Sequence, residues 1–378
     1  MRTLYDGAQK RGASTFMNRR RVHILYEYGT DLRPHGSAFI RLLRPLTYLT
    51  LGESLEITSD LTYDGQEVDA VIVDRLWRPD ISPSLAISLV ENVRRVGARL
   101  IYALDDNLLD LPARQLPLVS QGKAWPTEEH IWVVHFFLRQ ADGVVVTTPA
   151  LQERLLSLNP NMVVVPQALD ERLLVGGRPP PVSSPFGQRR KVIGYMGTLT
   201  HDDDLMMILP VFQTMWERHG GEIEFQIVGG VGRTDTLQTL QELPVRVVNP
   251  RPEEIEYPLF MLWFSSRLRW DIAVSPLKDT PFNQCKSDIK FLDYSAIGAA
   301  GIYSRVPAYE SSVRHLETGW LVENEVEAWV EALEELLSDD SLRTQLAQNA
   351  TRYLYAERIL ARCAHNWLKA LENLLGGA

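Results

Sequence analysis

The sequence predicts an α/β protein made of two Rossmann-like βαβ domains. Short apolar runs rich in valine and isoleucine alternate with amphipathic segments of helical spacing, a pattern typical of parallel sheets covered by helices. The alternation begins twice, at Arg21 and at Lys191, and each time a strand leads into a loop that contains glycine. Between the two halves, residues 176–188 are rich in glycine and proline and favour no regular structure.

These observations divide the chain into an N-terminal domain at 21–175, a linker at 176–188 and a C-terminal domain at 189–356. Residues 1–20 are basic and rich in small side chains, with Asp6 as their single acid, and we expect a disordered leader there. The alternative for this leader is weak peripheral attachment to anionic lipid.

Composition narrows the class of protein. A chain of 378 residues with 45% hydrophobic content suits two globular domains, and its net charge of −9 gives no general signature of nucleic-acid binding. Its two cysteines, Cys285 and Cys363, support neither a disulfide framework nor a cysteine-rich zinc site, which favours the reducing cytoplasm. No apolar run approaches the roughly 20 residues that span a bilayer, and the N-terminus lacks a secretory apolar core.

The N-terminal half is predicted to open with a strand, a turn-rich loop ending at Gly36, and a helix capped by Ser37. Asp105 and Asp106 follow its third strand, and the carboxyl ends of such strands face the cleft of a doubly wound sheet. The acid pair can orient a hydroxyl or act as a base, hold a metal ion, or simply cap a turn. The expected strands are 21–28, 68–75, 99–104, 143–147 and 162–166, and the expected helices are 37–43, 84–96, 128–140 and one from 149 or 150.

The C-terminal half repeats this arrangement. Its first strand ends at Gly197 and Thr198, where a backbone without bulky side chains can approach phosphate groups or simply turn. His201 then precedes three aspartates, which indicate either a helix start or an acidic metal motif. The expected strands are 191–196, 223–228, 245–248, 270–277, 301–304 and 319–322, and the expected helices are 205–218, 256–266, 287–300, 325–337, 342–355 and 357–375.

The helix predicted at 287–300 carries the most informative spacing. Lys286, Lys290 and Asp293 stand at i, i+4 and i+7 and share one face. The neighbouring face is an apolar stripe formed by Ile289, Leu292, Ala296 and Ala299. Lysines at a helix start oppose the macrodipole, so two ammonium groups beside free N–H groups form a strong anion site. Two cations for a diphosphate and a carboxylate for a ribose suit a nucleoside diphosphate. The alternative is an ordinary polar face paired with other side chains.

Several short motifs, taken in this order, resemble the C-terminal domain of retaining glycosyltransferases of the GT-B fold, family 4. The N-terminal half resembles that family more loosely, through Gly36, 102–106 and 141–147. The branch it is most similar to acts in O-antigen, capsule and cell-surface polysaccharide assembly. The matching C-terminal segments are Gly194–Thr198, Val274–Leu277, Phe282 with Asn283, Lys286–Tyr294, Gly298, Val306–Tyr309, Gly319–Val322 and Trp329–Arg343.

The resemblance implies two domains that face a central cleft, with the acceptor bound by the first and a nucleotide-sugar by the second. It also implies that the last segment, 357–378, returns to the N-terminal domain. The donor is then a nucleoside diphosphate-sugar, the acceptor a glycan or lipid-linked glycan hydroxyl, and neither a cofactor nor a metal ion is expected. The implied location is the cytoplasm, with contact at the inner face of the plasma membrane as a further expectation.

The expected site follows from these positions. We expect catalytic roles for Lys286, Lys290, Asp105 and Asp106, with the two lysines neutralising charge on the departing diphosphate. The residues expected to bind the donor are Gly36, Ser37, Gly197, Thr198, His201, Asn283, Lys286, Ser287, Lys290 and Asp293.

The sequence departs from the family at one acidic position. The family's two glutamates, with seven residues between them, correspond to Cys285 and Asp293 here, so only the second keeps an acid. A non-catalytic subunit that binds a nucleotide-sugar or glycan is therefore the alternative function. A two-lobed solute-binding protein also has paired βα domains, but the missing secretory signal disfavours it.

Overall fold

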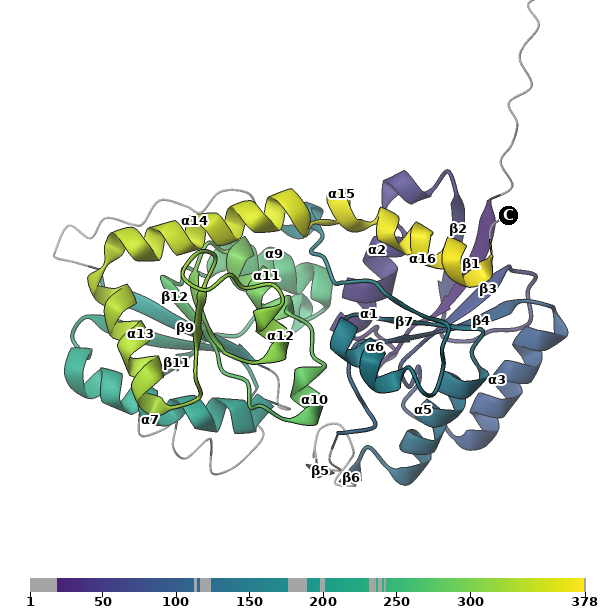
Figure 1. The fold of residues 1–378 in the computed structure, drawn as a ribbon, viewed down its shortest axis with the longest axis horizontal. Helices are drawn as coiled ribbons and strands as arrows, with labels where there is room; N and C mark the ends of the chain where they lie inside the picture. Colours follow the sequence, from purple (N-terminus) through teal and green to yellow (C-terminus); the bar gives the residue numbers. More distant parts are fainter. Residues whose placement is uncertain are drawn as a thin grey trace, which may run out of the picture.

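The computed structural model describes residues 19–111, 114–115, 124–175, 189–197, 201–230, 236, 240 and 243–376. They form two lobes, each built around a parallel six-stranded sheet (Figure 1). This is the expected pair of Rossmann-like domains. The predicted linker 176–188, residues 1–18 of the predicted leader and Thr198 lie outside the described residues.

The N-terminal sheet has the order β2-β1-β3-β4-β7-β8, and all its strands run parallel. Strand β3 is buried along its whole length because helices cover both faces of the sheet. Strand β2 was not predicted. Only Leu55 in it is buried, so no apolar run in the sequence marks the strand. The strands are β1 (Arg20–Leu25), β2 (Leu55–Asp60), β3 (Ala70–Asp74), β4 (Arg99–Leu104), β7 (Gly143–Val146) and β8 (Met162–Val164).

The first helical segment of this lobe differs from the prediction. It begins at Gly36 with His35 as its N-cap, so Ser37 lies inside the helix and caps nothing. The helix then widens into a π-helical turn. The helical elements are α1 (Gly36–Ala38), η1 (Phe39–Leu43), α2 (Arg44–Leu46), α3 (Pro83–Arg95), α5 (Glu128–Gln140) and α6 (Pro149–Leu155), and the short pair β5 (Arg114–Gln115) and β6 (Ala124–Trp125) precedes α5.

The C-terminal sheet has the order β11-β10-β9-β12-β13-β14, which is the strand order of a Rossmann fold. The order reverses between β9 and β12, and ligands of doubly wound sheets bind at the carboxyl ends of strands beside such a reversal. The strands are β9 (Lys191–Gly197), β10 (Ile223–Gly229), β11 (Val245–Val247), β12 (Ile272–Ser275), β13 (Ala300–Ser304) and β14 (Trp320–Val322), and the helices are α7 (Asp202–His219), α9 (Tyr257–Arg267), α10 (Pro281–Gln284), α11 (Ile289–Ala296), α12 (Pro307–Glu310), α13 (Val326–Ser338) and α14 (Asp340–Glu357).

Helix α11 is shorter than the predicted 287–300 and is separated from α10 by a loop, 285–288. The predicted apolar stripe is also incomplete. Ile289 and Ala296 are only half-buried, whereas Phe291, Leu292 and Tyr294 are fully buried in the core. The helix is enclosed on several sides, so a single stripe does not describe its packing.

The C-terminal segment 357–375 is broken into α15 (Leu360–Cys363) and α16 (His365–Leu375) instead of one helix. Helices α15 and α16 are separated at Ala364. Leu169 pairs with the chain between α14 and α15, since its N–H donates to Arg358 O and its carbonyl accepts from Leu360 N. Helix α16 packs Trp367 and Leu371 into the core of the N-terminal lobe, so the last helices span both lobes (Figure 1). None of the described helices is long and apolar enough to cross a membrane.

Candidate functional site

Lys290 and Asp293 lie on α11, and the Tyr294 hydroxyl of this helix accepts from Met196 N on β9 and donates to Val274 O on β12. Both are buried, with 9% and 6% of their surfaces exposed, and the ammonium of Lys290 and the Oδ1 atom of Asp293 have no hydrogen-bond partner among the described residues. The Lys290 Nζ atom lies 5.2 Å from the ring centroid of Tyr195 on β9. A buried ammonium that lacks hydrogen bonds gains strongly from an anion placed beside it.

Burial also shifts the pKa values of these two groups. It lowers the pKa of Lys290 to about 8, with Asp204 acting in the opposite direction. It raises the pKa of Asp293 to about 7, although Lys290 acts to lower it. Strongly perturbed groups in a cleft are typical of functional sites.

His201 stands at the start of α7 and faces the same region. Its Nδ1 atom lies 2.8 Å from Asp204 Oδ2, and Asp204 Oδ1 accepts a hydrogen bond from the backbone of Lys278. Burial, followed by the charge of Lys290, lowers the pKa of His201 to about 4, so its ring is neutral at pH 7 and donates to Asp204. No group of three or more potential metal ligands occurs among the described residues, and the three aspartates form the first turn of α7.

Other predicted residues on this side have structural partners of their own. A side chain at Gly197 would clash with Tyr195, because an added Cβ would lie 2.4 Å from its hydroxyl. The Asn283 side chain donates to the carbonyl of Lys278 and so holds the loop between β12 and α10. The structural contacts of Gly197 and Asn283 thus explain why these residue types occur here, without any role in ligand binding.

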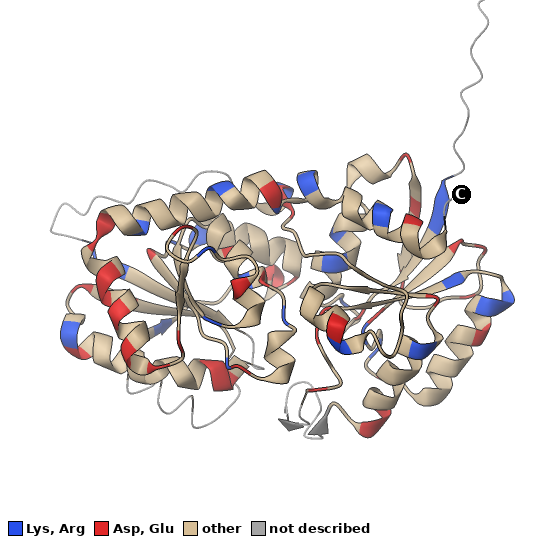
Figure 2. Cartoon of the chain, in the orientation of Figure 1, with Lys and Arg blue, Asp and Glu red and all other residues tan. Residues whose placement is uncertain are grey.

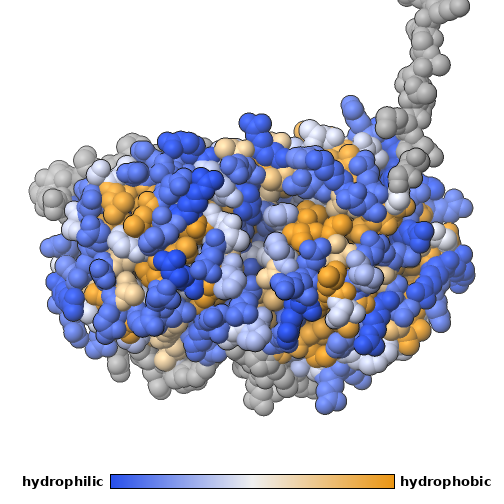
Figure 3. All heavy atoms as spheres, viewed as in Figure 1, coloured by the Kyte–Doolittle hydropathy of each residue, from blue (hydrophilic) through white to orange (hydrophobic). Residues whose placement is uncertain are grey.

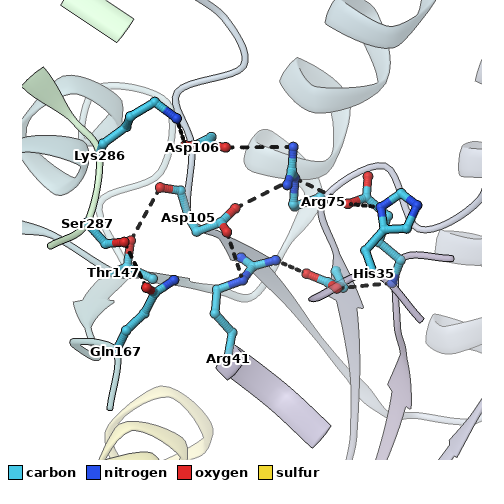
Figure 4. A network of polar contacts seen from close by, with 11 residues as sticks. His35, Arg41, Arg75, Asp105, Asp106, Thr147, Gln167, Lys286 and Ser287 are labelled. Atoms are coloured by element: carbon cyan, nitrogen blue, oxygen red, sulfur yellow. Dashed lines mark hydrogen bonds and ion pairs between the residues drawn. The ribbon is translucent and has the colours of Figure 1, made fainter. Parts of the chain in front are cut away.

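The ammonium of Lys286 points toward Asp106 of the N-terminal lobe (Figure 4). Its Nζ atom lies 3.4 Å from Asp106 Oδ1. Arg75 continues the network, with its Nη2 atom 3.8 Å from Asp106 Oδ2 and its Nε atom 3.6 Å from Asp105 Oδ1 and 3.4 Å from Glu27 Oε2. The expected face shared by Lys286 and Lys290 is thus wrong, because Lys286 precedes the helix.

The network extends deeper into the N-terminal lobe through Arg41, which lies on the π-helical turn. Its Nε atom lies 3.5 Å from Asp105 Oδ2, and its Nη2 atom pairs with Asp74 at the end of β3. On the other side, His35 Nδ1 lies 3.3 Å from Glu27 Oε2, and this hydrogen bond raises the pKa of His35. The side chains of Arg41 and Asp74 are 3% and 0% exposed, so these charges depend on each other.

Electrostatics keeps the outer carboxylates of this network ionised. Burial alone would raise the pKa of Asp106, but Lys286 and Arg75 bring it below its ordinary value. The same holds for Glu27, whose pKa Arg75 and His35 lower against the effect of burial. Asp106 is therefore a carboxylate at neutral pH.

Sequence reasoning missed Arg75, Arg41 and Glu27. Arg75 has a left-handed backbone with φ of 48°, a conformation that non-glycine residues avoid and that concentrates at functional sites. Its place directly after a buried strand was a usable signal, the same one that identified Asp105 and Asp106. Arg41 does not follow a buried strand, and its partners Asp74 and Asp105 lie far from it in the sequence, so no local pattern identifies it.

Residues of the N-terminal lobe and Arg358 at the end of α14 hold the loop 285–288. Thr148 Oγ1 donates to the carbonyl of Cys285, and Ser287 Oγ donates to Gln167 Oε1 at 2.7 Å. Arg358 closes the loop with two hydrogen bonds to Asp288. Ser287 and Lys286 thus contact the opposite lobe directly.

Gly36 lies at the same interface but further along it. A Cβ added there would lie 3.8 Å from the ring of Tyr257 on α9, and the rings of Phe39 and Tyr257 stack at 6.2 Å. Ser37 is half-buried on α1. The chain at Gly36 therefore contacts α9 of the C-terminal lobe, and its role as one lip of a donor cleft stays a prediction.

Known proteins resemble this chain in its C-terminal half and in its fold. Residues 190–339 match the family described as "Glycosyl transferases group 1". A D-inositol 3-phosphate glycosyltransferase of Corynebacterium urealyticum is 28% identical over 179 residues, which cover 43% of this chain and 39% of that protein. The match thus spans about two fifths of the length of this relative.

Two solved structures share the fold over nearly the whole chain. Sucrose-phosphate synthase from Thermosynechococcus elongatus has a TM-score of 0.68 at 14% identity, covering 94% of this chain and 99% of that one. HepE of Anabaena, solved in complex with UDP and glucose, has a TM-score of 0.62 at 13% identity, covering 94% and 100%. The chain has the two-domain GT-B fold, and residues 190–339 of its C-terminal half match the glycosyl transferases group 1 domain.

Proposed function

We propose that the chain is a retaining glycosyltransferase that moves a sugar from a nucleoside diphosphate-sugar to a hydroxyl of a glycan or lipid-linked glycan. The observation that carries this proposal is the buried Lys290 ammonium, which has no hydrogen bond among the described residues and lies where sheets of this type bind ligands. The matched family and the UDP complex of HepE support a nucleotide-sugar as the donor.

In this proposal Lys290 contacts the donor's diphosphate and stabilises the charge that develops as the diphosphate leaves. Lys286 does the same from the loop before α11, while Asp293 accepts hydrogen bonds from the ribose. The backbone N–H groups near Gly197 and Thr198 approach the phosphates. The donor is a substrate, and the proposal includes neither a cofactor nor a metal ion.

Across the cleft, Asp105 or Asp106 orients the acceptor hydroxyl. Retention follows from attack on the same face of the sugar, assisted by the leaving phosphate. Closure of the lobes around Gly36 excludes water and limits hydrolysis of the donor. We place the reaction in cell-surface polysaccharide synthesis of the O-antigen type, in the cytoplasm at the inner face of the plasma membrane.

One observation favours a second candidate, a non-catalytic subunit that binds a nucleotide-sugar or glycan. Cys285 stands where the resemblance implies an acid beside the donor sugar, and it is 4% exposed and packed with the core of the N-terminal lobe. Burial raises the pKa of its thiol, so it supplies no charge. Such a protein would bind the donor without turning it over.

A thermal-shift screen against UDP, GDP, dTDP and CDP, each with its sugars, tests the donor assignment. A ligand that binds only the folded chain raises the melting temperature, by an amount that grows with ligand concentration. We expect one nucleotide series to stand out. Transfer or slow hydrolysis of that donor, with the anomeric configuration read by NMR, supports the enzyme; binding without turnover supports the second candidate; no shift with any nucleotide contradicts both.

A further inference from the structure

We propose that Asp106 competes with the donor for Lys286. Donor binding would move the Lys286 ammonium from Asp106 to the diphosphate and leave the Asp106 carboxylate available to the acceptor hydroxyl. This inference rests on the proposed function, and it adds an order of events, in which the donor binds before the acceptor can be positioned.

The first support is the contact itself. The 3.4 Å separation of Lys286 Nζ and Asp106 Oδ1 is the ion pair that links this donor-side cation to the opposite lobe (Figure 4). Their side chains are 17% and 22% exposed, so both are largely desolvated where they meet. A diphosphate that takes Lys286 must therefore displace the carboxylate or share the ammonium with it.

The second support is that Asp106 can be released without becoming an isolated charge. Arg75 lies 3.8 Å from its other oxygen and is itself fixed by Glu27 and Asp105. Arg75 remains protonated throughout, because nearby carboxylates raise its pKa against the effect of burial. Asp106 thus keeps one cation when it gives up the other, and stays ionised to accept a hydrogen bond from a hydroxyl.

The third support is the way in which the loop is tied. Ser287 and Cys285 hold the backbone on both sides of Lys286 to the N-terminal lobe through Gln167 and Thr148. The lysine side chain is long and flexible, so its ammonium can change partner while the loop stays in place. The exchange therefore requires no separation of the lobes.

Replacing Asp106 by asparagine tests the competition. Asp106→Asn removes the competing charge but keeps the shape, so we expect the nucleoside diphosphate found in the screen to bind about fivefold more tightly, as measured by calorimetry. Because Asp106 also positions the acceptor, we expect kcat for transfer to fall about a hundredfold. A purely structural role of Asp106 would not make donor affinity rise while kcat falls.

Asp110→Asn is the matched control. Asp110 lies in the same loop after β4, its side chain is also 22% exposed, and it pairs with Arg154 instead of Lys286. We expect its donor affinity to stay within twofold of the wild type, so a gain of equal size in Asp110→Asn would indicate a general effect of net charge and overturn the proposal.

A double variant separates the inference from the function on which it rests. In a Lys286→Gln background, Asp106→Asn should no longer improve donor affinity, because the competition needs the ammonium. If the wild type binds no nucleoside diphosphate, the proposed function fails. If the wild type binds one and Asp106→Asn binds it equally or more weakly, with unchanged circular dichroism, only the competition fails.

Discussion

At the scale of single residues, the charge of Lys290 is the property on which donor binding depends. Burial lowers its pKa to about 8, so the ammonium is present at pH 7 and is lost as the pH rises through 8. We therefore expect nucleoside diphosphate affinity to fall between pH 7 and 9, where a lysine of ordinary pKa would stay charged. Because a bound diphosphate favours the ammonium, binding near pH 8 should also take up protons.

Calorimetry in buffers of different ionisation enthalpy measures both effects. Lys290→Arg keeps the positive charge at every pH in this range and should bind without the step near pH 8. An identical pH profile for the wild type and Lys290→Arg would show that another group titrates. The same pKa shift implies that Lys290 contributes stability that rises with pH between about 8 and 10.5, since the unfolded chain binds its proton more tightly there.

The residues of the site were predicted unequally well from the sequence. Lys290 and Asp293 were chosen by their spacing and are both buried, and their role in donor binding stays a prediction. Lys286 was assigned to the same helical face, which is wrong, because the chain forms a loop at 285–288. The partners Arg75 and Arg41 could not be assigned, since ion pairs between separate strands depend on tertiary structure.

At the scale of elements, strand β9 illustrates why the central sheet tolerates little change. Gly194 lies under the fully buried ring of Trp270, and an added Cβ would lie 1.9 Å from that ring. Gly194→Ala should therefore destabilise the C-terminal lobe by about 2–3 kcal/mol through overpacking. The check is the urea midpoint, with Gly221→Ala as control, because a Cβ there meets nothing within 4 Å. Equal midpoints for the two variants would mean that the Trp270 ring moves aside at no cost.

Helices and strands were predicted correctly where the apolar runs were long. The predictions failed where tertiary contacts determine the ends of an element. Helix α5 has the predicted bounds Glu128–Gln140, because a capping residue and a periodic apolar face define it locally. Strand β2 has almost no buried face and was missed. The break between α14 and α16 depends on the pairing of Leu169 with the chain at 358–360, which no local signal reveals.

At the scale of the whole molecule, polar contacts join the two lobes, beside the Phe39–Tyr257 ring pair and the buried Cys285. Basic and acidic segments are distributed over both lobes (Figure 2), and hydrophobic residues are visible on each lobe, whereas the surface between them is mostly of intermediate hydropathy (Figure 3). The contacts across it include the Lys286–Asp106 pair and the Ser287–Gln167 hydrogen bond. Interfaces of this kind permit relative motion of domains.

The architecture itself was the most secure prediction. Two restarts of the βα pattern, at Arg21 and Lys191, sufficed to predict two parallel sheets, because continuous apolar strands must be covered on both faces. The domain boundaries at 175–176 and 188–189 remain predictions, since the linker lies outside the described residues.

Titration of Lys290→Ala with the nucleoside diphosphate that stabilises the wild type tests the central claim most directly. Loss of a charge-assisted contact should weaken binding by about tenfold to a hundredfold and abolish transfer, while circular dichroism and thermal unfolding remain those of a folded chain. Lys191→Ala, at the opposite end of strand β9, is the control and should bind as the wild type does. Diphosphate affinity left unchanged by Lys290→Ala would contradict the assignment of this cleft as the donor site.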